Sequence, residues 1–166
     1  MVLFFDESRF GTHSNIGHGW FERGKRTAVK INLGRKNFYV YSAVSSLTGY
    51  SFSLLLPEVN TININIYLRE LANDLGSQKA IIIMDGASWH RSADLEIPEN
   101  LEIVLLPPYS PELNPTEKLW QYIKGNILKN KLYTCISKLE DAVCDFIKNI
   151  TSDRIISNCA CKYMYN

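Results

Sequence analysis

The sequence of 166 residues lacks three things: cysteine before position 135, an apolar run long enough to cross a bilayer, and an excess of either charge. A membrane span needs roughly 18–20 apolar residues, so we expect none. Val2 to Phe5 is too short for a secretory signal, because Asp6 follows at once. The four cysteines lie in no zinc-binding pattern, and we expect them to be reduced and partly buried. These absences favour a single cytoplasmic domain.

The net charge of +1, from 18 basic and 17 acidic residues, argues against a free-standing nucleic-acid binder. The charge is segregated along the chain, however. Residues 9–36 carry seven basic residues and one acidic residue (+6). Residues 37–117 carry three basic and ten acidic residues (−7), and residues 118–138 carry five basic residues and no acidic residue (+5). This pattern is compatible with a phosphate-binding rim around a carboxylate site. Solvated faces remain the simpler interpretation of the charge runs.

Strands and helices are expected to alternate. Short apolar or β-branched runs predict strands, and amphipathic spacing, with Gly76 as a stop signal, predicts helices. The predicted strands are Val2–Phe5, Asn37–Val44, Tyr50–Leu56, Ala80–Met84 and Glu102–Leu106, and the predicted helices are Thr61–Leu75, one opening near Asn114, and Ser137–Ile150. This order predicts an α/β fold, a mixed sheet flanked by helices.

The helix near Asn114 follows a rigid connector, Pro107–Pro111. Asn114-Pro115-Thr116-Glu117 has Asn at the N-cap, Pro at the first helical position and Glu at the third. That is the pattern of a capping box, in which Glu117 would accept from the Asn114 N–H.

Three carboxylates lie at predicted element ends: Asp6 and Asp85 each directly after a strand, and Glu117 in the first turn of a helix. If the strands are neighbours, both aspartates lie at one sheet edge, where ligands bind in open α/β sheets, and Glu117 could complete a triad. Such a cluster of negative charge predicts a divalent cation. Oxygen-only ligands favour Mg²⁺ or Mn²⁺, and two ions about 3.5–4 Å apart suit phosphoryl transfer.

Each carboxylate also has a purely structural alternative. Asp6 could pair with Arg9, Asp85 could open a turn with Gly86, and Glu117 could only complete the capping box. Each alternative is favoured when its residue is considered singly. The conjunction of three carboxylates at element ends favours the metal site.

Four blocks of sequence carry a resemblance. They are Asp6–Phe10, Trp20 with Gly24-Lys25, Met84–His90, and above all Leu105–Trp120, which reads Leu-Leu-Pro-Pro-Tyr-Ser-Pro-Glu-Leu-Asn-Pro-Thr-Glu-Lys-Leu-Trp. Together they resemble the catalytic domain of transposases in the insertion-sequence-630 branch of the mariner superfamily. The resemblance implies a ribonuclease-H-like fold and a metal-dependent endonuclease that cuts transposon ends and transfers strands. Carried over by position, its Asp-Asp-Glu triad is Asp6, Asp85 and Glu117.

The resemblance also shapes expectations about the rest of the protein. Relatives carry helix-turn-helix recognition modules before the catalytic domain. We therefore expect residues 1–166 to be one catalytic domain without that module, working with an upstream-frame product. A homodimer on paired DNA ends, located at the nucleoid, is expected. Gly86 stands where many relatives have Asn, which concerns a contact beside Asp85. The rival function is a catalytically silent, truncated transposase that regulates by binding DNA or full-length transposase.

Basic side chains are the candidate DNA contacts, with an ordinary structural histidine as the alternative at His90. The candidates are Arg23, Lys25, Arg26, Arg35, Lys36, His90, Lys118 and Lys124. Trp20, Trp89 and Trp120 could stack on unpaired bases, although core packing is favoured for each. Ser88, His90 and Asp85 contain the residue types of a hydrolase triad, but closeness in sequence does not create that geometry.

Overall fold

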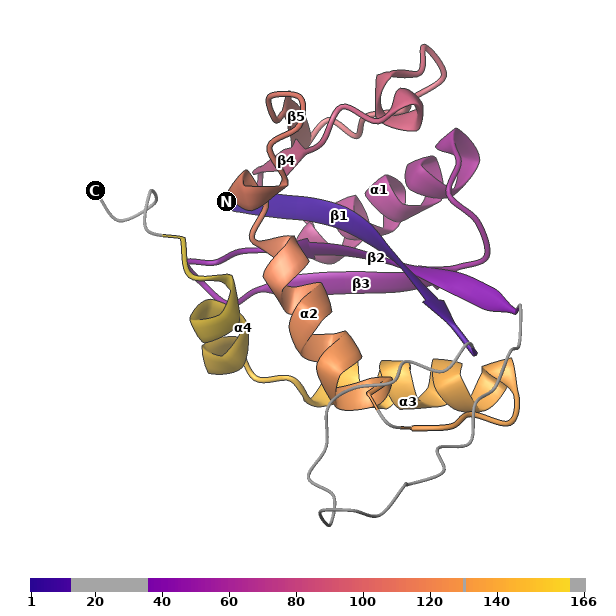
Figure 1. Ribbon diagram of the computed structural model, residues 1–166. Coiled ribbons are helices and arrows are strands. Elements are labelled where there is room, and N and C mark those ends of the chain that lie inside the picture. The colour runs from indigo at the N-terminus through magenta and orange to yellow at the C-terminus, as the bar shows by residue number, and fades with distance from the viewer. Residues whose placement is uncertain (13–35, 130, 162–166) are drawn as a thin grey trace, which may run out of the picture.

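The computed structural model describes residues 1–12, 36–129 and 131–161. Within these ranges five strands form one mixed sheet in the order β3-β2-β1-β4-β5 (Figure 1). Neighbours β1/β2 and β2/β3 are antiparallel, whereas β1/β4 and β4/β5 are parallel. The strands are β1 (Val2–Gly11), β2 (Asn37–Val44), β3 (Ser51–Leu56), β4 (Ala80–Met84) and β5 (Leu101–Leu105). The predicted mixed sheet is confirmed.

Helices cover both faces of the sheet. Helix α1 packs on one face, and α2, α3 and α4 pack on the other (Figure 1). The bounds are α1 (Thr61–Leu75), α2 (Thr116–Ile127), α3 (Ile136–Asn149) and α4 (Ser152–Cys159), with the short 3₁₀ turns η1 (Ser88–Arg91) and η2 (Pro111–Leu113). No helix in the described part of the chain is long and apolar enough to cross a membrane.

Strand β1 contributes to the core on both faces because its side chains alternate. Leu3 and Phe5 lie in the cluster under α1, whereas Phe4 and Phe10 lie in the cluster under α2. All four are buried. The alternation continues past Phe5, so Asp6 faces the α2 side and Glu7 faces the α1 side.

Two glycines lie where the chain turns, and Gly76 ends α1 as the sequence predicts. Gly49 has φ +71° in the β2–β3 hairpin, and a Cβ there would lie 2.5 Å from the Ser152 carbonyl oxygen. Gly76 has φ +58° and donates its N–H to the last carbonyls of α1. Both positions need glycine's freedom at positive φ, and Gly49 also needs its lack of a side chain.

Two sequence predictions about elements are wrong. The first strand does not end at Phe5 but continues to Gly11, because β2 pairs with it from Phe4 onward. Antiparallel pairing therefore carries the strand through polar residues that periodicity alone marks as its end. Helix α4 was not predicted at all, and its buried side chains, Ile155 and Cys159, belong to the cluster under α2. The cysteines are free, with Cys159 and Cys161 buried, as expected.

Candidate active site

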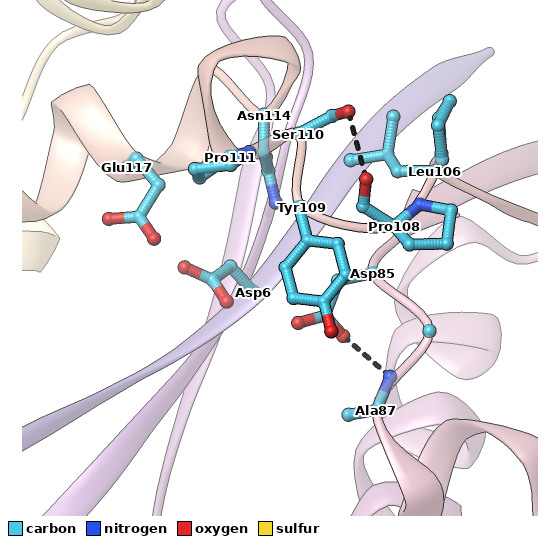
Figure 2. A pocket seen from close by; sticks show the side chains of 12 residues that line it. Asp6, Asp85, Ala87, Leu106, Pro108, Tyr109, Ser110, Pro111, Asn114 and Glu117 are labelled. Carbon is cyan, nitrogen blue, oxygen red and sulfur yellow. Dashed lines mark hydrogen bonds between the residues drawn. The ribbon is translucent and has the colours of Figure 1, made fainter.

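The register of the parallel strands brings Asp6 and Asp85 together. Phe4 pairs with Ile83, and β4 ends at Met84, one residue before Asp85. Continuing the same register by two residues sets Asp6 opposite Asp85. The ladder has ended there, so the two strands separate and leave an opening. A pocket lies at this opening, and Asp6, Asp85 and Glu117 all line it (Figure 2). The predicted convergence occurs, although Asp6 lies in the middle of a strand.

Glu117 reaches the pocket because the start of α2 is tied to β1. The Asn114 amide donates to the Phe5 carbonyl at 2.9 Å, and the Thr116 hydroxyl donates to the Phe4 carbonyl at 2.8 Å. Both bonds are buried, so they are costly to break. Figure 2 shows the carboxylates of Glu117 and Asp6 pointing toward each other.

The predicted capping box forms only in part. The Asn114 side-chain oxygen accepts from the Thr116 N–H at 3.1 Å, which satisfies one donor of the first turn. The Asn114 N–H, however, donates to the Pro111 carbonyl at 3.0 Å. It is therefore not available to Glu117 for the return bond. The capping alternative for Glu117 is not supported, and its carboxylate lines the pocket instead.

Asp6 is held by a tryptophan. The Trp120 indole N–H donates to Asp6 Oδ2 at 2.8 Å. Burial, followed by the charges of Glu117 and Glu7, raises the pKa of Asp6 to about 7, against the lowering effect of the Trp120 bond. The alternative partner, Arg9, donates to Asn37 instead. The fold thus disfavours the ionised form of Asp6, and among the described hydrogen bonds no basic side chain donates to its carboxylate.

Asp85 has both a turn role and a histidine partner. Its Oδ1 accepts from the Ala87 N–H at 3.1 Å, so the predicted turn forms. The same oxygen lies 2.8 Å from His90 Nδ1. The Asp85 side chain is nevertheless 61% exposed, which leaves it accessible from the pocket.

His90 links Asp85 to Glu7 across the sheet edge. Its Nε2 lies 2.9 Å from Glu7 Oε1, and its side chain is 1% exposed. The Trp89 indole N–H also donates to Glu7, at 3.3 Å. Burial alone would lower the pKa of His90, but Glu7 and then Asp85 outweigh it and raise that pKa. With both ring nitrogens facing protein oxygens, the structure favours the structural alternative for His90 over direct contact with a phosphate.

Replacing His90 with Gln is expected to destabilise the fold by about 3 kcal/mol, because Glu7, whose side chain is 7% exposed, would lose its buried partner. The exposed Asp85 contact adds little. The loss should be largest below about pH 6.5 and shrink as the pH rises through the raised pKa of His90. Urea unfolding of H90Q, E7Q and the double variant measures this. Additive losses in the double variant would contradict a Glu7–His90 pair.

The other candidate DNA contacts are scattered. Lys124 lies on the α2 face near the carboxylates: burial lowers its pKa, whereas Glu117 and Asp6 oppose that shift, and its ammonium lies 5.4 Å from the Phe10 ring centroid. Lys118 donates to the Ala160 carbonyl, and Lys36 is exposed before β2. Arg23, Lys25, Arg26 and Arg35 lie outside the described residues, as does Trp20. Of the described tryptophans, Trp120 is buried, as favoured.

The donors in the pocket suit a hard divalent cation, being carboxylate oxygens from three elements. Burial, together with the charges of the neighbouring acids, raises the pKa of Asp6, as expected for carboxylates gathered in one pocket. Among the described residues, no set of three His, Cys, Asp or Glu side chains is close enough to hold a metal ion as it stands. The residue types thus suit a hard metal ion, but in this arrangement the three carboxylates are too far apart to bind one ion together.

Sequence reasoning missed the residues that hold the carboxylates. Glu7 and the Trp120 bond to Asp6 were not anticipated, although Glu7 follows Asp6 and must face the opposite side of an extended strand. That alternation predicts that the side chains of Asp6 and Glu7 contact different residues, on opposite faces of the sheet. It does not identify His90, because residues 7 and 90 meet only through strand pairing.

Comparisons with known proteins identify the family of this chain. The family described as DDE superfamily endonuclease matches residues 1–140. An uncharacterized protein of Sinorhizobium fredii, y4pE/y4sA, is 35% identical over 96 residues, covering 57% of this chain and 71% of that protein. An uncharacterized 39 kDa protein of insertion element IS630 from Shigella sonnei is 24% identical over 155 residues, covering 90% of this chain and 45% of that protein.

The fold is similar to that of solved transposase complexes. Paired-end complexes of the Mos1 mariner transposase with Mn and with Mg match with TM-scores of 0.75 and 0.71, at 15% and 17% identity. Each match covers 95% of this chain and 51% of the other. The chain thus spans about half the length of these proteins. The ribonuclease-H-like fold implied by the sequence resemblance is confirmed.

Proposed function

The chain belongs to the DDE superfamily endonuclease family, and we propose that it is the catalytic domain of a transposase that cuts DNA at transposon ends and joins the freed 3′-hydroxyl to target DNA. One observation carries this proposal: Asp6, Asp85 and Glu117, from three separate elements, line a single pocket at the sheet edge. Family membership makes the endonuclease class the natural use of such a pocket.

In this proposal Asp6, Asp85 and Glu117 are the catalytic residues and would hold Mg²⁺ or Mn²⁺, two ions in all. Bound ions would activate the attacking water or hydroxyl and stabilise the leaving oxygen. The protein's part is to present ionised carboxylates. Asp6 must lose its proton, and because burial and the charges of Glu117 and Glu7 raise its pKa, added positive charge would favour that loss.

Neighbouring side chains orient the carboxylates for this role. The Trp120 N–H fixes one oxygen of Asp6, and the Ala87 N–H fixes Asp85 Oδ1. His90 Nδ1 bonds the main-chain carbonyl of Asp85 at 3.0 Å and lies 2.8 Å from the same Oδ1. Trp120 and His90 are buried, so these orientations are built into the fold before any ligand arrives. Such preorganisation lowers the cost of assembling a site.

Partners and location follow as parts of the same proposal. DNA would be held through its phosphates by exposed basic side chains, including Lys36 and Lys118, with Lys124 beside the carboxylates. Arg23, Lys25, Arg26 and Arg35 are proposed for the same role. The chain would act in the cytoplasm at the nucleoid, as a homodimer on paired ends, with end recognition supplied by an upstream-frame product.

A plasmid-nicking assay tests the function. Incubating the full chain with supercoiled plasmid should produce nicked circles when Mn²⁺ or Mg²⁺ is present and none when a chelator is added. Exposed residues of the same type that do not line the pocket provide matched controls: Glu112→Gln and Asp141→Asn should nick like the unaltered protein.

Absence of metal-dependent nicking, both for the chain alone and for the chain joined to its upstream frame, would overturn the enzymatic proposal. That outcome would favour the regulator that binds DNA or full-length transposase. Nicking that persists in chelator would also contradict it, because it would come from a metal-independent or contaminating activity.

A further inference from the structure

Tyr109 has two unusual properties together. Its side chain is fully exposed, and its backbone has φ +59°, the only non-glycine residue with positive φ among the described residues. Left-handed backbone is unfavourable for a residue with a bulky side chain. Exposed aromatic surface gains nothing from burial in the core. Neither property stabilises the fold, and strained residues cluster at functional sites.

The strain is imposed by a connector that is fixed at both ends. The Leu106 N–H donates to the Met84 carbonyl at 2.7 Å, and Asn114 is tied to β1 by its buried amide. Between these anchors the prolines restrict the backbone, and the Ser110 hydroxyl donates to the Pro108 carbonyl at 3.3 Å. The ring of Tyr109 is therefore presented on a rigid support.

The ring stands at the mouth of the carboxylate pocket. Tyr109 lines that pocket together with Asp6 and Asp85, and Figure 2 shows the three side chains around it. Across the described ranges the ring makes no aromatic contact and no hydrogen bond. A flat, unpartnered surface is thus held beside the place where a phosphodiester would be cut.

We propose that Tyr109 stacks on an unpaired nucleobase next to the phosphodiester bound in the pocket. The inference rests on the proposed function, which places DNA there. Of the groups next to a scissile phosphate, the base is the one with a flat face that matches an aromatic ring. Bases inside a duplex are already stacked, so the partner is a base freed at a nick or a frayed end. Such stacking is possible with any base, so it would increase the affinity for DNA without adding sequence specificity.

The test compares two DNA hairpins that share the same short single-stranded overhang, one with its bases and one with abasic sites. In chelator, where no cleavage occurs, fluorescence anisotropy should show the full chain binding the base-containing overhang at least about fivefold more tightly. Tyr109→Ala should bring that ratio close to one. Because both DNAs carry the same phosphates, the ratio reports the base contact alone.

Two further variants separate the ring from its hydroxyl and from the backbone. Tyr109→Phe should keep the preference, because it keeps the ring. Tyr109→Gly should lose it while unfolding at the same or a higher temperature, since glycine adopts positive φ without strain. Loss of the preference in the Phe variant would overturn stacking in favour of a hydroxyl contact. A clearly lower unfolding temperature in the Gly variant would overturn it in favour of a structural role.

The outcomes also separate this proposal from the proposed function. Metal-dependent nicking by a chain that does not distinguish the two hairpins would leave the endonuclease standing and overturn the role of Tyr109. Failure to bind either hairpin at millimolar DNA would overturn the role of Tyr109 as well. Retained base preference without nicking would support the stacking contact and contradict the endonuclease. Photo-crosslinking of an overhang containing 5-iodouracil should place the adduct on Tyr109; an adduct confined to other residues would overturn the proposal.

Discussion

Replacing Glu117 with Gln is expected to lower metal-dependent nicking at least about 100-fold while leaving the free energy of unfolding within about 1 kcal/mol. Gln has the same shape but carries no negative charge, so a hard cation would lose a charged ligand. Two effects of this substitution on the free energy of unfolding oppose each other. Loss of an acid in the first turn of α2 costs about 0.3–1 kcal/mol through the helix dipole, whereas relief of repulsion with Asp6 offsets it.

Nicking of supercoiled plasmid in Mn²⁺ and urea unfolding in chelator measure the two effects. Glu112→Gln is the matched control, because Glu112 lies five positions earlier and does not line the pocket. It should behave like the unaltered protein in both assays. Full nicking by E117Q would show that Glu117 is not a ligand. A large loss of stability would show that the carboxylate is mainly structural, despite the occupied Asn114 N–H.

Replacing Asp6 with Asn is expected to abolish nicking and to stabilise the metal-free protein. The pKa of Asp6 is raised from 3.8 to about 7 in the fold. The unfolded chain therefore ionises first, and ionisation costs stability as the pH rises from about 4 to 7. At pH 8 the cost is fully present, up to about 4 kcal/mol, and Asn removes it. At pH 4, where the unfolded chain is only about half ionised at Asp6 and the folded protein is protonated there, the cost is below about 1 kcal/mol and the two proteins should be nearly equal in stability.

Urea unfolding in chelator at pH 4 and pH 8, for the unaltered chain and D6N, measures the sign and the size of the difference in their free energies of unfolding. The Asn side-chain oxygen can still accept from Trp120, so the indole bond is kept. Asp141→Asn on α3 is the control, because Asp141 is exposed and does not line the pocket. A clear destabilisation of D6N at pH 8 would indicate that Asp6 belongs to a stabilising ion pair. Added Mn²⁺ should narrow the difference by stabilising the unaltered chain.

Much of the site could be predicted because its carboxylates lie near changes of element. Asp85 follows a strand that is apolar throughout, and Glu117 follows a proline-rich connector, and both signals are local. Asp6 was identified for a partly wrong reason, since its strand continues to Gly11. The supporting residues could not be found this way. Glu7 and His90 are 83 positions apart, and their contact depends on how β1 pairs with β4.

The strained tyrosine illustrates the same division. Three prolines around Tyr109 predict a rigid connector. They do not predict which residue takes positive φ, because that is decided by the anchors at Leu106 and Asn114. The direction of the ring over the pocket therefore emerges only when both ends are fixed.

Local sequence was enough to predict most strands and helices, the end of α1 at Gly76 and the carboxylates at Asp85 and Glu117 near element ends; α4 and the second half of β1 were the exceptions. Those properties depend on short-range periodicity and on backbone conformations available to single residues. The tertiary structure alone decided that Asp6 and Asp85 share a pocket with Glu117, and that Glu7 is buried against His90. Strand register and the buried bonds from α2 to β1 set those neighbours, and such long-range pairings leave no local pattern in the chain.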